Sequence, residues 1–124
     1  MSCLFCDKIN NHNNFLYENQ SVTAFFDEYP VSTGHVLIVT KRHIETYFEA
    51  SLSEKRDIDL AIMKLKSHLD DLFHPDGYNI GINNGSASGQ TIMHLHVHLI
   101  PRYKGDTSNP RGGVRGVIPK KQSY

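Results

Sequence analysis

The sequence predicts an α+β fold in which an antiparallel sheet of about five strands packs against one main helix. Two observations lead to this prediction. Short apolar segments with alternating side chains occur toward both ends of the chain, and one long segment between them, residues 51–73, carries apolar residues at three- and four-residue spacing. The 124 residues suffice for a single compact domain, residues 1–124, which we expect to end in a basic tail, residues 102–124.

The first strands are separated by recognisable turns. Residues 1–14 are expected to be irregular, with at most a helical turn, and residues 15–18 to form a short strand. Residues 21–29 alternate between two sets of side chains, and residues 35–40 form an apolar, β-branched run that suits a central strand. Pro30 ends the first of these two strands, because proline cannot donate a hydrogen bond to a sheet.

The long helix over residues 51–73 is predicted from its ends as well as from its spacing. Ser51 and Glu54 match a capping box, although Ser53 is a rival N-cap. The sequence His-Pro-Asp-Gly at residues 74–77 ends the helix, since proline breaks it and glycine tolerates the turn. The predicted apolar stripe consists of Ile58, Ile62, Leu65, Leu69 and Leu72.

A further strand over residues 78–83 and a loop of small residues lead into three alternating histidines, His94, His96 and His98. In an extended strand these imidazoles point to one face, while the aliphatic residues between them point to the other, toward the core. We expect Pro101 to end this strand. Three imidazoles are costly to bury without partners, so the row indicates a functional site and not simple packing.

Two chemistries fit such a row, namely metal ligation and nucleophilic catalysis by a central imidazole. A single zinc ion held by all three histidines is excluded, because three residues in register on one strand span too far. The preceding loop, residues 85–91, has the composition of an anion-binding nest, and Gln90 and Thr91 add side-chain donors. It lacks the Gly-Lys-Ser/Thr of a P-loop. A phosphate cradle beside a nucleophile indicates phosphoryl or nucleotidyl transfer.

The run His-Leu-His-Val-His-Leu-Ile at residues 94–100 resembles the signature of the histidine triad superfamily of nucleotide hydrolases and transferases. Residues 34–38, residues 83–91 and Asp27 match as well. The resemblance implies an α+β fold paired into a symmetric homodimer. It further implies cleavage at the α-phosphate of a purine dinucleoside polyphosphate or a nucleoside phosphoramidate. A non-catalytic module that binds purine nucleotides and signals through a dimer surface is the alternative.

The resemblance also implies roles for individual residues. His96 attacks the α-phosphorus to form a covalent nucleotidyl-histidine, and His98 donates to a phosphate oxygen. Thr91 assists the leaving group, and Asp27 accepts hydrogen bonds from the ribose. The residues expected to hold the phosphate are Asn83, Gly89, Gln90 and Thr91, and those expected to wall the base are Phe5, Phe25 and Leu37.

The two cysteines of the chain form a Cys-x-x-Cys pair, which in a reducing compartment indicates metal binding or redox chemistry. The resemblance extends to bacterial triad proteins that hold zinc with such a pair, a histidine after the central strand and the first triad histidine. The matching residues here are Cys3, Cys6, His43 and His94. The family relay would instead run from His35 through His94 to His96. His94 cannot serve both roles, and the coincidence of four ligands favours structural zinc.

The formal net charge is zero, but six Lys or Arg and one Asp fall in residues 101–124, which gives +5 there and −5 in the rest. A basic tail suits an anionic partner, and we expect Arg111 and Arg115 to reach the phosphates beyond the α position.

No nucleic-acid partner is expected. No apolar run reaches the roughly 20 residues of a membrane span, and the N-terminus lacks a signal-peptide pattern, so we expect a cytoplasmic protein without a membrane partner. The remaining histidines are interpreted as ordinary surface residues: His12, His68 and His74.

Overall fold

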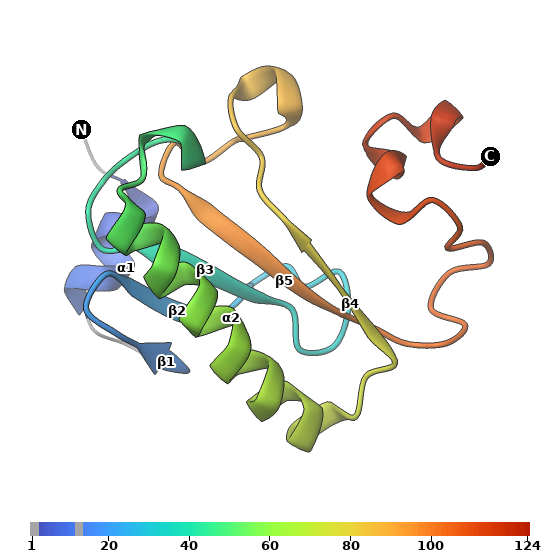
Figure 1. Cartoon of the computed structure of the whole chain (residues 1–124), viewed down its shortest axis with the longest axis horizontal. Coiled ribbons are helices and arrows are strands. Elements are labelled where there is room, and N and C mark those ends of the chain that lie inside the picture. Colours follow the sequence, from blue (N-terminus) through green and yellow to red (C-terminus); the bar gives the residue numbers. More distant parts are fainter. Residues whose placement is uncertain (1–2, 12–13) are drawn as a thin grey trace.

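The computed structural model describes residues 3–11 and 14–124 and confirms the predicted α+β architecture, with α2 packed on one face of the sheet (Figure 1). Five antiparallel strands lie in the order β1-β2-β3-β5-β4. The strands are β1 (Tyr17–Glu18), β2 (Val22–Phe26), β3 (Val36–Thr40), β4 (Gly77–Gly81) and β5 (His96–Arg102), and the α-helices are α1 (Leu4–Asn11) and α2 (Leu52–Phe73). His12 lies outside the described residues.

The sheet is buried on both faces at its centre. On one face, α2 covers the main core, whose largest fully buried members are Ile38, Leu65, Leu69, Leu95 and Leu99. On the other face, a smaller cluster of Phe5, Phe25, Leu37 and Val39 lies under α1. The predicted alternation of β2 is therefore real, but both of its faces are covered, and only Phe26 at its end is 41% exposed.

Helix α1 corrects the expectation of an irregular N-terminal segment. It spans Leu4–Asn11 and buries Phe5 to 2% exposure against Phe25, with 5.8 Å between the ring centroids. A helix of two turns gains little from propensity alone, because nucleation is costly. Its stability comes from tertiary contacts, which a pattern of so few apolar residues does not reveal.

The ends of α2 follow the predicted capping chemistry, with two differences. Ser51 is the N-cap and forms a reciprocal capping box with Glu54, so Ser53 lies inside the helix. The left-handed C-terminal residue is His74, with a φ of 51°, and the glycine that was expected to take this turn starts β4. Leu72 is 51% exposed, whereas Ala61 is fully buried and takes a place in the apolar stripe.

Strand β5 starts later and ends later than predicted. His94 lies in a bend before the strand, which begins at His96 and continues through Pro101 to Arg102. The pairing of β3 with β5 stops at Val36 and Leu99, so Pro101 lies beyond the end of that ladder and removes no hydrogen bond from it. The carbonyl of Pro101 accepts instead from the hydroxyl of Ser32, at 2.6 Å.

The C-terminal tail carries two short 3₁₀ turns, Gly113–Val117 and Pro119–Lys121, and lies beyond the β4 edge of the sheet, far from α1 (Figure 1). In the described part of the chain, no helix combines the length and apolar character needed to cross a membrane.

Leu69→Ala should lower the free energy of unfolding by about 2–5 kcal/mol, because a fully buried leucine leaves a cavity that the surrounding core fills only partly. The exposed Lys64 of the same helix provides the control, since Lys64→Ala should change the free energy by at most about 0.5 kcal/mol. Urea denaturation of the three proteins measures both values. Equal effects of the two substitutions would contradict the assigned packing of α2.

Candidate functional site

A cavity of about 290 Å³ lies where α1 approaches β2, β3 and the start of β5. Its lining combines two kinds of residue. The apolar ones include Leu4, Phe5, Phe25, Leu37 and Ile92, and the polar ones include Asn83, Thr91, His96 and His98. The cavity thus offers both the apolar contacts and the polar groups that a nucleoside phosphate requires.

His96 presents one nitrogen to this cavity with its lone pair available. The other nitrogen, Nδ1, lies 2.8 Å from the backbone carbonyl oxygen of His94. A carbonyl oxygen can only accept, so Nδ1 carries a proton, and in the neutral ring Nε2 is the nitrogen that bears the lone pair. The ring is 8% exposed and meets the edge of Phe5, with 5.0 Å between the centroids. This buried, oriented imidazole has the geometry of a nucleophile.

His98 presents the opposite tautomer through a chain that starts at a backbone amide. The N–H of Val31 donates to Nδ1 of His35 at 3.1 Å, so the proton of His35 resides on Nε2. That Nε2 lies 2.9 Å from Nδ1 of His98 and donates to it. Nε2 of His98 therefore carries a proton and acts as a donor. Two neighbouring imidazoles on β5 are thereby set as one acceptor and one donor.

His35 and His98 are both held neutral. Burial lowers the pKa of His35, and Asp27, whose Oδ2 lies 3.5 Å from Nε2 of His35, offsets part of that effect. Burial, together with the nearby His96 and His35 and against a smaller opposing effect of Asp27, lowers the pKa of His98 to about 4. A neutral His98 at ordinary pH keeps the hydrogen bond from His35.

These contacts do not support the alternative relay from His35 through His94 to His96. His35 pairs with His98 and not with His94, whose Nε2 donates to the carbonyl of Thr40 at 2.7 Å. The row of histidines on one face gave no indication of which residue His35 would contact, because the register of β3 against β5 decides it.

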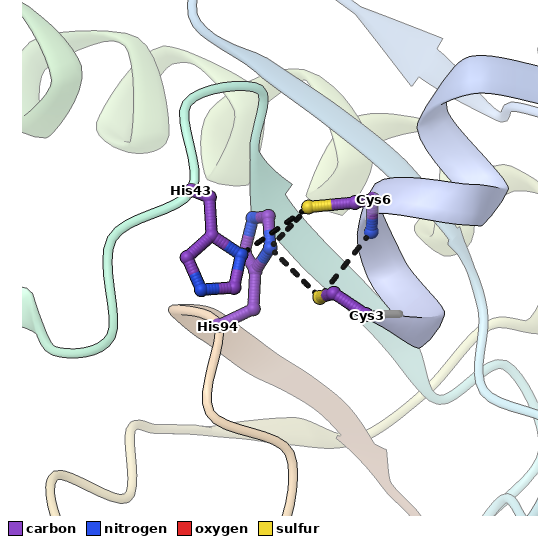
Figure 2. Close-up of side chains that lie close together, drawn as sticks. All are labelled: Cys3, Cys6, His43 and His94. Carbon is purple, nitrogen blue, oxygen red and sulfur yellow. Dashed lines mark hydrogen bonds between the residues drawn. The ribbon is translucent and has the colours of Figure 1, made fainter. Parts of the chain in front are cut away.

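Four side chains from three segments converge at a second cluster, Cys3 and Cys6 at the start of α1, His43 after β3 and His94 before β5 (Figure 2). Nδ1 of His94 lies 3.4 Å from Sγ of Cys3 and 3.5 Å from Sγ of Cys6, and Nδ1 of His43 lies 3.2 Å from Sγ of Cys6. The edges of a tetrahedral zinc site, given its bond lengths, measure about 3.5 Å between sulfur and nitrogen. The donor set and its spacing fit zinc.

The protonation of these ligands also fits a cation. Because Nε2 of His94 donates to Thr40, its Nδ1 keeps a lone pair toward the cysteines, the usual support for a metal-bound histidine. Burial lowers the pKa of His94, which keeps the ring neutral. Burial and the adjacent Cys3 raise the pKa of the Cys6 thiol, and a bound cation offsets that penalty on the thiolates.

A second group of potential ligands, Asp27, His35 and His98, lies at the cavity but is set up differently. The Val31 amide at Nδ1 of His35 forces the proton onto Nε2, the nitrogen that faces the other two residues. A metal would need that nitrogen unprotonated. We therefore interpret this group as a hydrogen-bond chain.

The small-residue loop is held in shape by Gln90, which is 4% exposed. Its Oε1 accepts from the amide of Gly85, and its Nε2 donates to the carbonyls of Glu45 and Ile92. Both ends of the amide are thus used within the protein, and this does not support the expected contact with phosphate. Gly85 and Gly89, with φ of 91° and 94°, take the left-handed conformations that the tight loop requires.

The remaining predicted residues divide in two groups. Asp27, Asn83, Gly89 and Thr91 line the cavity as expected, whereas Arg111 and Arg115 are not among its lining residues. Both arginines stack on Tyr124, at 4.9 and 4.7 Å from the ring centroid, and Arg115 also donates to the carbonyls of Lys121 and Gln122. Sequence reasoning missed Lys8, because α1 was not foreseen. The structure places Lys8 in the lining of the cavity.

Comparisons with known proteins identify the family of this chain. The family model of the HIT domain matches residues 8–105. An uncharacterized HIT-like protein of Methanocaldococcus jannaschii is 41% identical over 106 residues, which cover 84% of this chain and 81% of that protein. The asymmetrical bis(5′-nucleosyl)-tetraphosphatase of Schizosaccharomyces pombe is 35% identical over 92 residues, which cover 74% of this chain and 50% of that enzyme. The crystal structure of a zinc-bound histidine triad family protein from Mycobacterium smegmatis superposes with a TM-score of 0.79 at 28% identity, covering 88% of this chain and 81% of that one. The chain therefore belongs to the HIT domain family.

Proposed function

We propose that this protein is a nucleotide hydrolase or transferase that cleaves at the α-phosphate of a purine dinucleoside polyphosphate or a nucleoside phosphoramidate. The observation that carries the proposal is the fixed tautomer of His96, whose Nε2 lone pair faces a cavity lined by both apolar and polar residues. The tetraphosphatase among its relatives supports the same class of reaction.

The reaction takes place in two displacements. Nε2 of His96 attacks the α-phosphorus, a nitrogen–phosphorus bond forms, and the bond to the leaving group breaks with its electron pair. The leaving group takes up a proton, with the hydroxyl of Thr91 as the nearby donor. Water, or another acceptor, then attacks the phosphorus, and the nitrogen–phosphorus bond breaks with its electron pair returning to Nε2 of His96. The proton that the acceptor loses restores the hydroxyl of Thr91.

The surrounding groups bind the nucleotide and stabilise developing charge. The Nε2–H of His98 donates to a non-bridging phosphate oxygen, together with the side chain of Asn83. The backbone amide of Gly89 donates to the carbonyl of Ser86 at 3.0 Å, so Gly89 contributes its place in the cavity wall and not its N–H. Asp27 accepts from the ribose hydroxyls through the oxygen that the Tyr29 amide leaves free. Phe5, Phe25 and Leu37 wall the base.

The arrangement favours an enzyme over a module that only binds nucleotides. A bare lone pair aimed at an anionic phosphate repels its oxygens and adds nothing to ground-state affinity, whereas nucleophilic attack requires it. A binding module would be better served by a second donor at this position, like the one that His98 supplies.

The proposal includes one structural zinc per chain, held by Cys3, Cys6, His43 and His94.

The proposal also includes a symmetric homodimer. In the described chain β4 is an edge strand that pairs with β5 alone. Ile80 on this strand is 49% exposed, and Val114 and Val117 in the tail are 61% and 77% exposed. An open edge with apolar side chains beside it is a surface that proteins normally cover. A second copy of the chain, adding its own β4 edge, is the partner that the resemblance implies.

His96→Asn should abolish turnover of a fluorogenic adenosine phosphoramidate while nucleotide affinity stays within roughly tenfold, because the ring forms a bond and contributes little to ground-state binding. The exposed His68 of α2 provides the matched control, and His68→Asn should keep full activity. Mass spectrometry of quenched reactions should find the nucleotidyl adduct on the peptide that contains His96. Turnover retained in His96→Asn would refute the covalent mechanism.

The imidazole of His98 should stay neutral, in the Nε2–H form, throughout pH 5–8, since burial holds its pKa at about 4. An ordinary histidine would gain a proton near pH 6.5 within this window. Nitrogen-15 NMR of the histidine side chains measures both the tautomer and the titration. A midpoint near 6.5, or a proton found on Nδ1, would be incompatible with the chain from Val31 through His35.

Purified protein should contain about one zinc ion per chain, as the four-ligand cluster implies. Cys3→Ser and Cys6→Ser should each lower the zinc content and the melting temperature, whereas Asn10→Ser, at an exposed position of the same helix, should change neither. Atomic absorption and thermal denaturation provide the readouts. A zinc-free wild-type protein with the stability of both cysteine variants would exclude the zinc site.

A further inference from the structure

Helix α1 belongs to both sites at once. Cys3 and Cys6, at its start, point to the metal cluster, as Figure 2 shows for the side chains on the helix ribbon. Phe5 and Lys8 of the same helix line the nucleotide cavity. The helix is therefore one wall of the cavity and also supplies half of the ligands for the metal.

Apart from the cluster, α1 is held to the sheet by its apolar side chains. Phe5 is buried with Phe25, Leu37 and Val39, and Ile9 packs against the same group. Lys8 adds an exposed ion pair of 2.9 Å with Glu28, which contributes between about 0 and 1 kcal/mol, and eight residues are too few for a helix that is stable by itself. The cluster of Cys3, Cys6, His43 and His94 adds a direct connection from the start of α1 to the segments next to β3 and β5.

A second connection passes through His94. Its side chain is a ligand of the cluster, while its backbone carbonyl accepts the proton of Nδ1 in His96. The ring of Phe5 touches both histidines edge-on, with 6.0 Å to the centroid of His94 and 5.0 Å to that of His96. Displacement of the cluster would therefore disturb the cavity wall and the orientation of the nucleophile together.

We propose that zinc occupancy sets the affinity of the cavity for nucleotides, with Phe5 as the positioning residue that transmits the effect. Zinc at the cluster holds α1 against the sheet, and α1 in that position places Phe5 over His96 and against the nucleoside. The inference rests on the proposed function, because it assumes that a nucleotide occupies the cavity. Coupling between two bound species is reciprocal, so a nucleotide must tighten zinc binding by the factor by which zinc tightens nucleotide binding.

The test measures both halves of this coupling with adenosine 5′-monophosphate and zinc. Zinc affinity is measured by competition with a chromophoric chelator, with and without saturating nucleotide, and nucleotide affinity by calorimetry on zinc-loaded and zinc-stripped protein. Both ratios should agree at roughly tenfold, inside the range usual for coupled sites. Hydrogen exchange of the stripped protein should show loss of protection confined to α1.

Three variants locate the coupling in Phe5. Zinc-loaded Phe5→Ala should keep its metal, bind the nucleotide more weakly and lose most of the coupling ratio, since its α1 no longer reaches the nucleoside. Phe5→Leu should restore part of both. Asn10→Ala, at an exposed position of the same helix, should behave like the wild type. The Phe5 comparison uses zinc-loaded protein, so it decides the question even if the stripped wild type unfolds as a whole.

The outcomes separate this inference from the function beneath it. If zinc-loaded wild type binds the nucleotide but its zinc affinity is the same with and without nucleotide, the metal has only a structural role. The inference is then overturned while the proposed function stands. An unchanged coupling ratio in Phe5→Ala would remove Phe5 from the connection and overturn the inference as stated. If zinc-loaded wild type binds no nucleotide, the proposed function and the inference fall together.

Discussion

The chemistry of this protein depends on hydrogen bonds between buried imidazoles and the polypeptide backbone. In each of three histidines one ring nitrogen is engaged by a peptide group, which fixes what the other nitrogen can do. The carbonyl of Thr40 leaves His94 with a lone pair for a metal, and the carbonyl of His94 leaves His96 with one for an electrophile. The amide of Val31 has the opposite effect on His35, and through it makes His98 a donor. Three similar side chains thereby acquire three different roles.

The sheet positions the imidazoles of His96 and His98 beside these groups, of which only the carbonyl of Thr40 belongs to a strand. β3 and β5 are neighbours in the middle of the sheet, and their register brings Val39 opposite His96 and Leu37 opposite His98. The aliphatic residues between the histidines pack under α2, so the strand cannot slip by one residue without turning its imidazoles into the core. Packing on one face of the strand therefore enforces the chemistry on the other.

The sequence was most informative where periodicity decides the structure. The alternation of His96 and His98 with Val97 and Leu99 predicted which face would carry the imidazoles, and the capping box at Ser51 predicted where α2 begins. The four residues proposed as zinc ligands came from a resemblance, and the fold brings their ligand atoms within 4.8 Å of one another.

What escaped prediction depends on contacts between distant segments. α1 exists because Phe5 is buried against the sheet, Gln90 turns inward because a loop needs its amide, and Pro101 continues β5 because β3 has already ended. None of these follows from the residues on either side. The same holds for the partner of His35, which only strand register determines.

The cluster at the start of α1 also has a consequence for how the chain is made. Cys3 and His94 are 91 positions apart, and Cys6 and His43 are 37 apart. A chain that grows from its N-terminus presents both thiols long before the last of their partners is synthesised. The complete set can form only after β3 and β5 have paired, so the proposed zinc can find all four of its ligands only at the end of folding. Until then the cysteines of the nascent chain are two adjacent thiols with no cluster around them.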